Sequence, residues 1–158
     1  MRGFAMTYQY IVDPRLVVDI LEGDAEWGVR SARLVDSHRN DRLFITPLSY
    51  LALGPVFMGM RSMQDTFLAN LGISVAQKFP IEVMNSAYKA WCDYKGDHPG
   101  ASGPGSAFDS LYIGAFALLY DGILTRQGDL YRRYYPSLPV IEPVKVGKLK
   151  VGKLKVEG

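Results

Sequence analysis

Short apolar runs alternate with longer stretches of helical periodicity along most of this chain. Each short run has the length and composition of a buried parallel strand; the runs are residues 9–12, 42–45, 123–125 and 140–141. Between them, apolar residues recur at helical spacing, which predicts helices over 14–22, 24–40, 47–53, 61–71, 80–94, 110–120 and 130–135. This alternation favours right-handed crossovers and predicts an α/β fold in three layers, with a central, mainly parallel sheet flanked by helices.

The stretch 110–136 shows the pattern most clearly. Small residues at Gly114 and Ala115 allow another element to approach the first helix closely, and Gly122 follows the helix end in a position where glycine readily takes the left-handed conformation. The loop 125–129 then follows a buried strand. Because open α/β sheets bind ligands at the carboxyl ends of their strands, this loop is a candidate binding segment.

Asp13 stands at the corresponding place after the first predicted strand. Pro14 suits the first position of a helix and Asp13 the N-cap before it, so Asp13 is explained as a helix cap without any further role. Thr46 and Pro47 repeat this arrangement after the second strand. Whether Asp13 is only a cap or also a functional acid is open at this point.

The sequence resembles the PIN-domain family, the fold of the VapC-type toxin ribonucleases. The matching elements are Gly114-Ala115, Leu124-Thr125-Arg126, the run 131–136 and the position of Asp13. The resemblance covers roughly residues 8–143 and implies a PIN-like domain over 1–143. It also implies metal-dependent endoribonuclease activity with Mg²⁺ or Mn²⁺ as cofactor, since hard cations prefer oxygen ligands and activate water.

The acids that this activity requires are largely missing. The positions that match the family's four acids hold Asp13, Ala52, Ser110 and Gln127. Three neutral residues in a metal site leave too little charge to hold a strongly hydrated cation, so we expect metal binding to be weak and activity weak or lost. Drift, inactivation, or engineering of a sequence to keep the fold would each leave this pattern.

Neighbouring residues are the remaining candidates for the site. We expect Asp13 and Asp109 as metal ligands, Asp13 and Asp129 as catalytic acids, and Arg126 and Arg132 as substrate-binding cations. Asp109 precedes Ser110, and one helical residue turns a side chain by roughly 100°, so Asp109 is expected to point away from the site.

Charge and composition refine this view without deciding it. The net charge is +2, but the Lys/Val/Gly repeat tail at 144–158 carries +4, so residues 1–143 carry −2. A mildly acidic body does not indicate strong nucleic-acid affinity. The single cysteine, Cys92, indicates a reducing, cytoplasmic compartment, and no apolar run reaches the roughly 18–20 residues that cross a membrane.

Two classes of function therefore remain. One is a PIN-type endoribonuclease that retains some metal-dependent activity. The other is a non-catalytic PIN-fold scaffold that binds RNA, an antitoxin-like peptide or a second copy of itself. A further alternative is that the chain is a generic α/β domain whose resemblance to the family is accidental. A homodimer is expected from apolar residues that cluster near one helix, namely Met58, Met60, Met63 and Phe67.

Overall fold

The structure is a computed structural model that describes residues 6–78, 80–100 and 106–144. In this part of the chain, five parallel strands form one sheet in the order β3-β2-β1-β4-β5. The strands are β1 (Gln9–Val12), β2 (Arg42–Ile45), β3 (Ile73–Val75), β4 (Gly122–Leu124) and β5 (Val140–Ile141). β1 lies at the centre, so the chain leaves it first toward one edge of the sheet and later returns to build the other.

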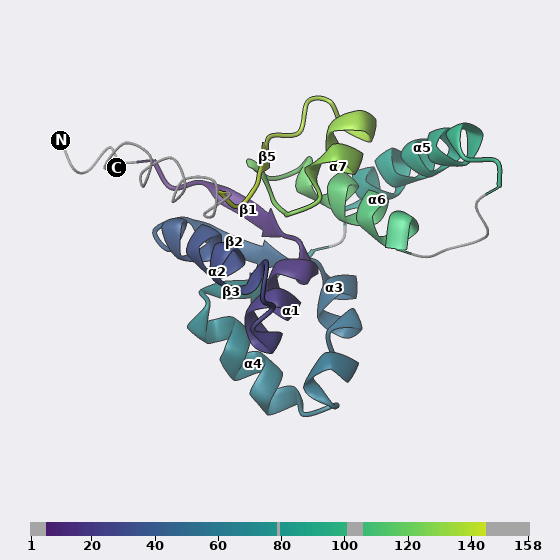
Figure 1. Cartoon of the computed structure of the whole chain (residues 1–158). Coiled ribbons are helices and arrows are strands. Elements are labelled where there is room, and N and C mark those ends of the chain that lie inside the picture. Colours follow the sequence, from purple (N-terminus) through teal and green to yellow (C-terminus); the bar gives the residue numbers. More distant parts are fainter. Residues whose placement is uncertain (1–5, 79, 101–105, 145–158) are drawn as a thin grey trace, which may run out of the picture.

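Helices cover both faces of this sheet (Figure 1). They are α1 (Pro14–Glu22), α2 (Gly28–Ser37), α3 (Pro47–Ala52), the short 3-10 helix η2 (Pro55–Phe57), α4 (Arg61–Asn70), α5 (Ile81–Asp97), α6 (Ser106–Ala117) and α7 (Gly128–Tyr134). In Figure 1, α1, α2 and α4 lie on one side of the strands, and α5, α6 and α7 lie on the other. The three-layer α/β fold predicted from the sequence is confirmed.

The sheet separates two apolar cores because neighbouring strand residues point to opposite faces. In β1, Ile11 packs with residues of α5, α6 and α7, whereas Val12 packs with residues of α1, α2 and α4. Ile123 and Leu124 of β4 divide in the same way. All four side chains are fully buried, which explains why these strands read as short continuous apolar runs.

Most predicted helices and strands are present, with ends shifted by a few residues. The helix expected over 110–120, for example, spans Ser106–Ala117, so Gly122 lies in β4 rather than at the end of that helix. The edge strand β3, which lies between α4 and α5, was not among the predicted strands. The helix expected from residue 24 begins instead at Gly28, because the Asp24 carboxylate accepts the backbone N–H groups of Glu26 and Trp27 in a turn. The strand expected at 123–125 spans Gly122–Leu124. The repeat tail lies outside the described residues, apart from Val144.

Close packing at Gly114 is as the sequence predicted. A Cβ atom built on Gly114 would lie 2.5 Å from the Tyr135 ring and 3.0 Å from the Tyr131 ring. The missing side chain therefore lets α7 pack directly on α6, and this contact brings Tyr131 to the carboxyl end of the sheet. No helix in the described part of the chain has the length and hydropathy needed to span a bilayer.

Candidate functional site

Polar side chains gather at the carboxyl ends of the two central strands. Asp13 follows β1 and Thr125 follows β4, and the Asp13 N–H donates to the Leu124 carbonyl at 2.9 Å. Both side chains are completely buried. The parallel pairing of β1 with β4 therefore fixes two polar groups side by side, although they stand 112 residues apart in the sequence.

The Asp13 carboxylate uses both of its oxygens within the protein. Oδ1 accepts the Arg15 backbone N–H at 3.0 Å, which makes Asp13 the N-cap of α1, as predicted. Oδ2 accepts the Thr125 hydroxyl at 2.9 Å and the Tyr131 hydroxyl at 3.2 Å. The carboxylate is thus satisfied by donors from α1, the loop after β4, and α7.

Arg15 supplies the positive charge in this cluster. Its Nη1 lies 3.4 Å from Asp13 Oδ2 and 3.3 Å from Ser110 Oγ, while its side chain is 27% exposed. Ser110 stands at one of the positions where the resemblance implies an acid. The guanidinium therefore lies between Asp13 and that position, and it reaches solvent on its outer side.

Tyr131 closes the cluster from inside. Burial raises the pKa of its hydroxyl well above the ordinary value, and the negative charge of Asp13 raises it further. Tyr131 is fully buried and remains a neutral phenol at physiological pH, so it acts as a hydrogen-bond donor to the carboxylate. The network of Asp13, Arg15, Ser110, Thr125 and Tyr131 is called the Asp13 cluster below.

The Asp13 cluster does not fit a Mg²⁺ or Mn²⁺ ion. These ions take several oxygen ligands, with carboxylates as the main charged donors. Within the described ranges, no group of three or more acidic, histidine or cysteine side chains is placed to hold a metal. Asp13 already accepts hydrogen bonds on both oxygens, and the nearest charged side chain, Arg15, is a cation that would repel a metal.

The other two positions at which the resemblance implies an acid lie near this cluster. Ala52 is on α3 and lines a pocket together with Arg15. Gln127 is exposed and precedes α7, and its backbone N–H donates to Thr125 Oγ1 at 3.1 Å, one hydrogen bond away from Asp13. The structure therefore brings Asp13, Ser110 and the backbone of Gln127 together, with Ala52 on the wall of the adjoining pocket.

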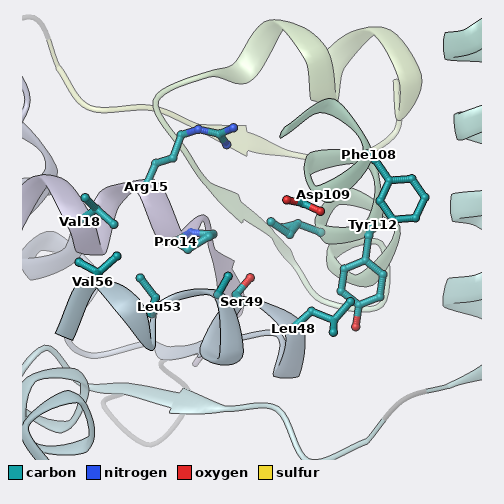
Figure 2. A pocket seen from close by; sticks show the side chains of 12 residues that line it. Pro14, Arg15, Val18, Leu48, Ser49, Leu53, Val56, Phe108, Asp109 and Tyr112 are labelled. Atoms are coloured by element: carbon teal, nitrogen blue, oxygen red, sulfur yellow. The ribbon is translucent and has the colours of Figure 1, made fainter. Parts of the chain in front are cut away.

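This pocket lies between α1, α3, η2 and α6 and has a volume of about 390 Å³. Figure 2 shows Pro14, Arg15 and Val18 on one wall, Leu48, Ser49, Leu53 and Val56 on a second, and Phe108, Asp109 and Tyr112 on the third. Asp109 was expected to point away from the site. It does not contact Asp13, but its carboxylate lies at the pocket, between Arg15 and Tyr112 in this view.

The expected substrate-binding cations already have carboxylate partners. Arg126 Nε lies 2.8 Å from Asp19 Oδ2, and the two side chains form an ion pair. Burial raises the pKa of Asp19, and the charge of Arg126 opposes that shift. Arg132 pairs with Glu142 at 2.7 Å and with Asp129 at 3.7 Å.

Asp129, the second expected catalytic acid, is fully exposed on α7 and has its ion pair with Arg132. It makes no hydrogen bond to the Asp13 cluster among the described residues. Sequence reasoning also missed Arg15, Thr125 and Tyr131 as members of this cluster. The contact of Arg15 with Asp13 could have been predicted from their spacing, because a cation two residues after an N-cap acid can reach back to its carboxylate.

The fold and the cluster together define an α/β protein of PIN-like fold with an ion pair, Asp13 and Arg15, at the carboxyl ends of its central strands. No protein-family model matches the chain, and no curated protein matches it in sequence. Among solved structures, the chain is similar to VapBC2 from Rickettsia felis bound to a DNA fragment from their promoter. The TM-score is 0.56 at 11% identity, over 86% of this chain and 99% of that chain. At this identity the similarity shows the fold.

Proposed function

We propose that this chain is a non-catalytic PIN-fold protein that acts by binding a protein partner. The observation that carries the proposal is the Arg15 guanidinium, 3.4 Å from Asp13 and 3.3 Å from Ser110. A cation at this point supplies the charge that a divalent ion would otherwise supply to Asp13. It activates no water, because a guanidinium neither coordinates a water molecule as a Lewis acid nor takes up a proton at neutral pH.

The paired arginines favour a protein partner over RNA. Arg126, Arg132 and Arg133 each have a carboxylate within 4 Å, so a phosphate would have to displace an acid from each of them. Exposed apolar side chains on and after α3 favour contact with a protein; Leu51 is 67% exposed and Met58 is 77% exposed. An antitoxin-like peptide is the partner that we propose, from the resemblance to VapC-type toxins and the similarity of fold to VapBC2.

The test combines metal binding with RNA cleavage and RNA binding. Calorimetric titration of the full chain with Mn²⁺ should show no saturable heat below about 1 mM, and labelled RNA should remain intact with or without EDTA. Fluorescence anisotropy should give weak, salt-sensitive RNA binding. Cleavage that EDTA abolishes would overturn the proposal in favour of a retained endoribonuclease that uses Asp13, Asp109 or Asp129.

A gain-of-function variant tests the same reading from the other side. Replacing the three neutral residues alone should fail, because a new acid at residue 110 would pair with Arg15 rather than with a metal. The set with Arg15 also removed should bind Mn²⁺ and lose stability without it, since like charges then face one another. This set is Arg15→Ala, Ala52→Glu, Ser110→Asp and Gln127→Asp. Metal binding by the triple variant to the same extent as by the quadruple variant would contradict the role of Arg15.

A further inference from the structure

The pocket beside the Asp13 cluster has the properties of a small-molecule site. Its volume of about 390 Å³ falls within the range of about 300–1,000 Å³ that is typical of such sites. Most of its wall is apolar and comes from three separate parts of the chain; the apolar residues include Pro14, Val18, Leu48, Leu53, Val56 and Ile113. Burial of the apolar part of a ligand in this pocket would therefore favour binding.

Two charged side chains line the pocket, and whether each has an ion-pair partner indicates which charge a ligand should carry. Arg15 is already paired with Asp13, so the two together present no net charge to the pocket. Asp109, in the first turn of α6, is exposed and forms no ion pair with any residue in the described ranges. The charge left for a ligand is therefore negative, and it lies next to the apolar wall (Figure 2).

We propose that this pocket binds a small organic cation, with an apolar body between α1, α3 and α6 and an ammonium or amidinium group beside Asp109. The inference rests on the proposed function, since it names a ligand class for the pocket beside a cluster that we propose holds no metal. An organic anion fits less well, because it would face Asp109 and compete with Asp13 for Arg15.

A matched set of three probes tests the sign of the charge. They are 4-phenylbutylammonium, 4-phenylbutanol and 5-phenylpentanoate, which share a phenyl ring with four methylene groups and differ in the end group. Calorimetric titration of the full chain should rank them in that order, with the amine about two- to fivefold tighter than the alcohol, as expected for one partly exposed ion pair. Binding of the carboxylate as tightly as the amine would overturn the proposal.

Variants then locate the site. Asp109→Asn should remove the advantage of the amine over the alcohol, and Asp109→Lys should reverse the preference so that the carboxylate binds best. Asp129→Asn is the matched control, because Asp129 is an exposed acid in the first turn of α7 and should leave all three affinities unchanged. Equal effects of Asp109→Asn and Asp129→Asn would show that only net charge matters and would overturn the assignment.

Filling the pocket tests the apolar part of the proposal. Ala52 is exposed on α3 and lines the pocket, so Ala52→Trp should fold normally and reduce binding of all three probes at least tenfold. Unchanged affinities in a folded Ala52→Trp variant would place the probes elsewhere and overturn the site.

Failure here is distinguishable from failure of the proposed function. If neither the amine nor Mn²⁺ binds, the organic-cation site is wrong and the non-catalytic reading stands. If Mn²⁺ binds to the unmodified chain, displaces the amine and loses its affinity in Asp109→Asn, both proposals are overturned.

Discussion

The ion pair between Asp13 and Arg15 allows a quantitative test of how the cluster is held. We expect Arg15→Met, which keeps most of the aliphatic stem, to lower the free energy of unfolding by about 1–2 kcal/mol. A buried ion pair broken on one side costs about 3–5 kcal/mol, because the remaining charge is left without a partner in a poorly solvated site. The lower value applies here because Arg15 is 27% exposed, its contacts to the carboxylate are 3.4–3.5 Å long, and Asp13 keeps its hydrogen bonds to Thr125 and Tyr131.

The complementary change, Asp13→Asn, keeps the shape and the N-cap acceptor but removes the charge. It should cost about 2–3 kcal/mol, since the hydroxyls of Thr125 and Tyr131 then donate to a neutral amide oxygen or lose their acceptor. The double variant should be little worse than Asp13→Asn alone. The expected coupling energy between Asp13 and Arg15 is therefore about 1–2 kcal/mol.

Urea unfolding followed by far-UV circular dichroism measures all four proteins of this cycle, with unchanged m-values as the check that the transitions are comparable. The exposed pair of Lys89 and Asp93, 2.7 Å apart on α5, is the control and should couple much more weakly, because solvent screens it. Added salt should reduce the control coupling more than that of the buried pair. A coupling between Asp13 and Arg15 no larger than the control value would refute the view that Arg15 neutralises the cluster.

Three further outcomes follow from the packing. Gly114→Ala should lower the free energy of unfolding by about 1–3 kcal/mol in thermal or urea unfolding, because the new Cβ would lie 2.5 Å from the Tyr135 ring. The control is Gly96→Ala on α5, which should be neutral or stabilising because a Cβ there has no neighbour within 4 Å. Above pH 10 the unfolded chain releases the Tyr131 proton and the folded chain holds it, so the free energy of unfolding should fall by up to about 1.4 kcal/mol per pH unit from this group. Tyr131→Phe should make that fall shallower. An unchanged pH dependence in this variant would argue against a neutral buried phenol. Self-association through the exposed methionines should appear as a concentration-dependent dimer in sedimentation, weakened by Met63→Glu, and a strict monomer at high concentration would count against it.

Most of the fold could be predicted from the sequence, because helix caps and short apolar runs involve only residues close together in the chain. Asp13-Pro14 and Thr46-Pro47 begin α1 and α3 as expected, and the continuous apolar runs mark strands that are buried on both faces. β3 was missed as a strand because Ser74 interrupts a run of only three residues at the edge of the sheet, where pairing with β2 supplies the missing stabilisation.

The candidate site was predicted only in part, for a physical reason. Sequence identified the position of Asp13 and the neutral residue at Ser110, since both follow from motif spacing. It could not show that Arg15 turns back toward both of them, or that Tyr131 reaches Asp13 from 118 residues away. Such contacts depend on which rotamers remain once α6 and α7 are packed together.

By itself, then, the sequence determined the order of the helices and of four of the five strands, the cap at Asp13 and the close approach at Gly114. All of these depend on neighbours along the chain or on the absence of a side chain. Only the tertiary structure decided what surrounds the Asp13 carboxylate and which charge is left at the pocket. A buried charge takes whatever donors the packed elements bring within about 3 Å of it, and here they come from α1, α7 and the loop after β4. That arrangement left Asp109 facing the pocket with its charge uncompensated by the described residues.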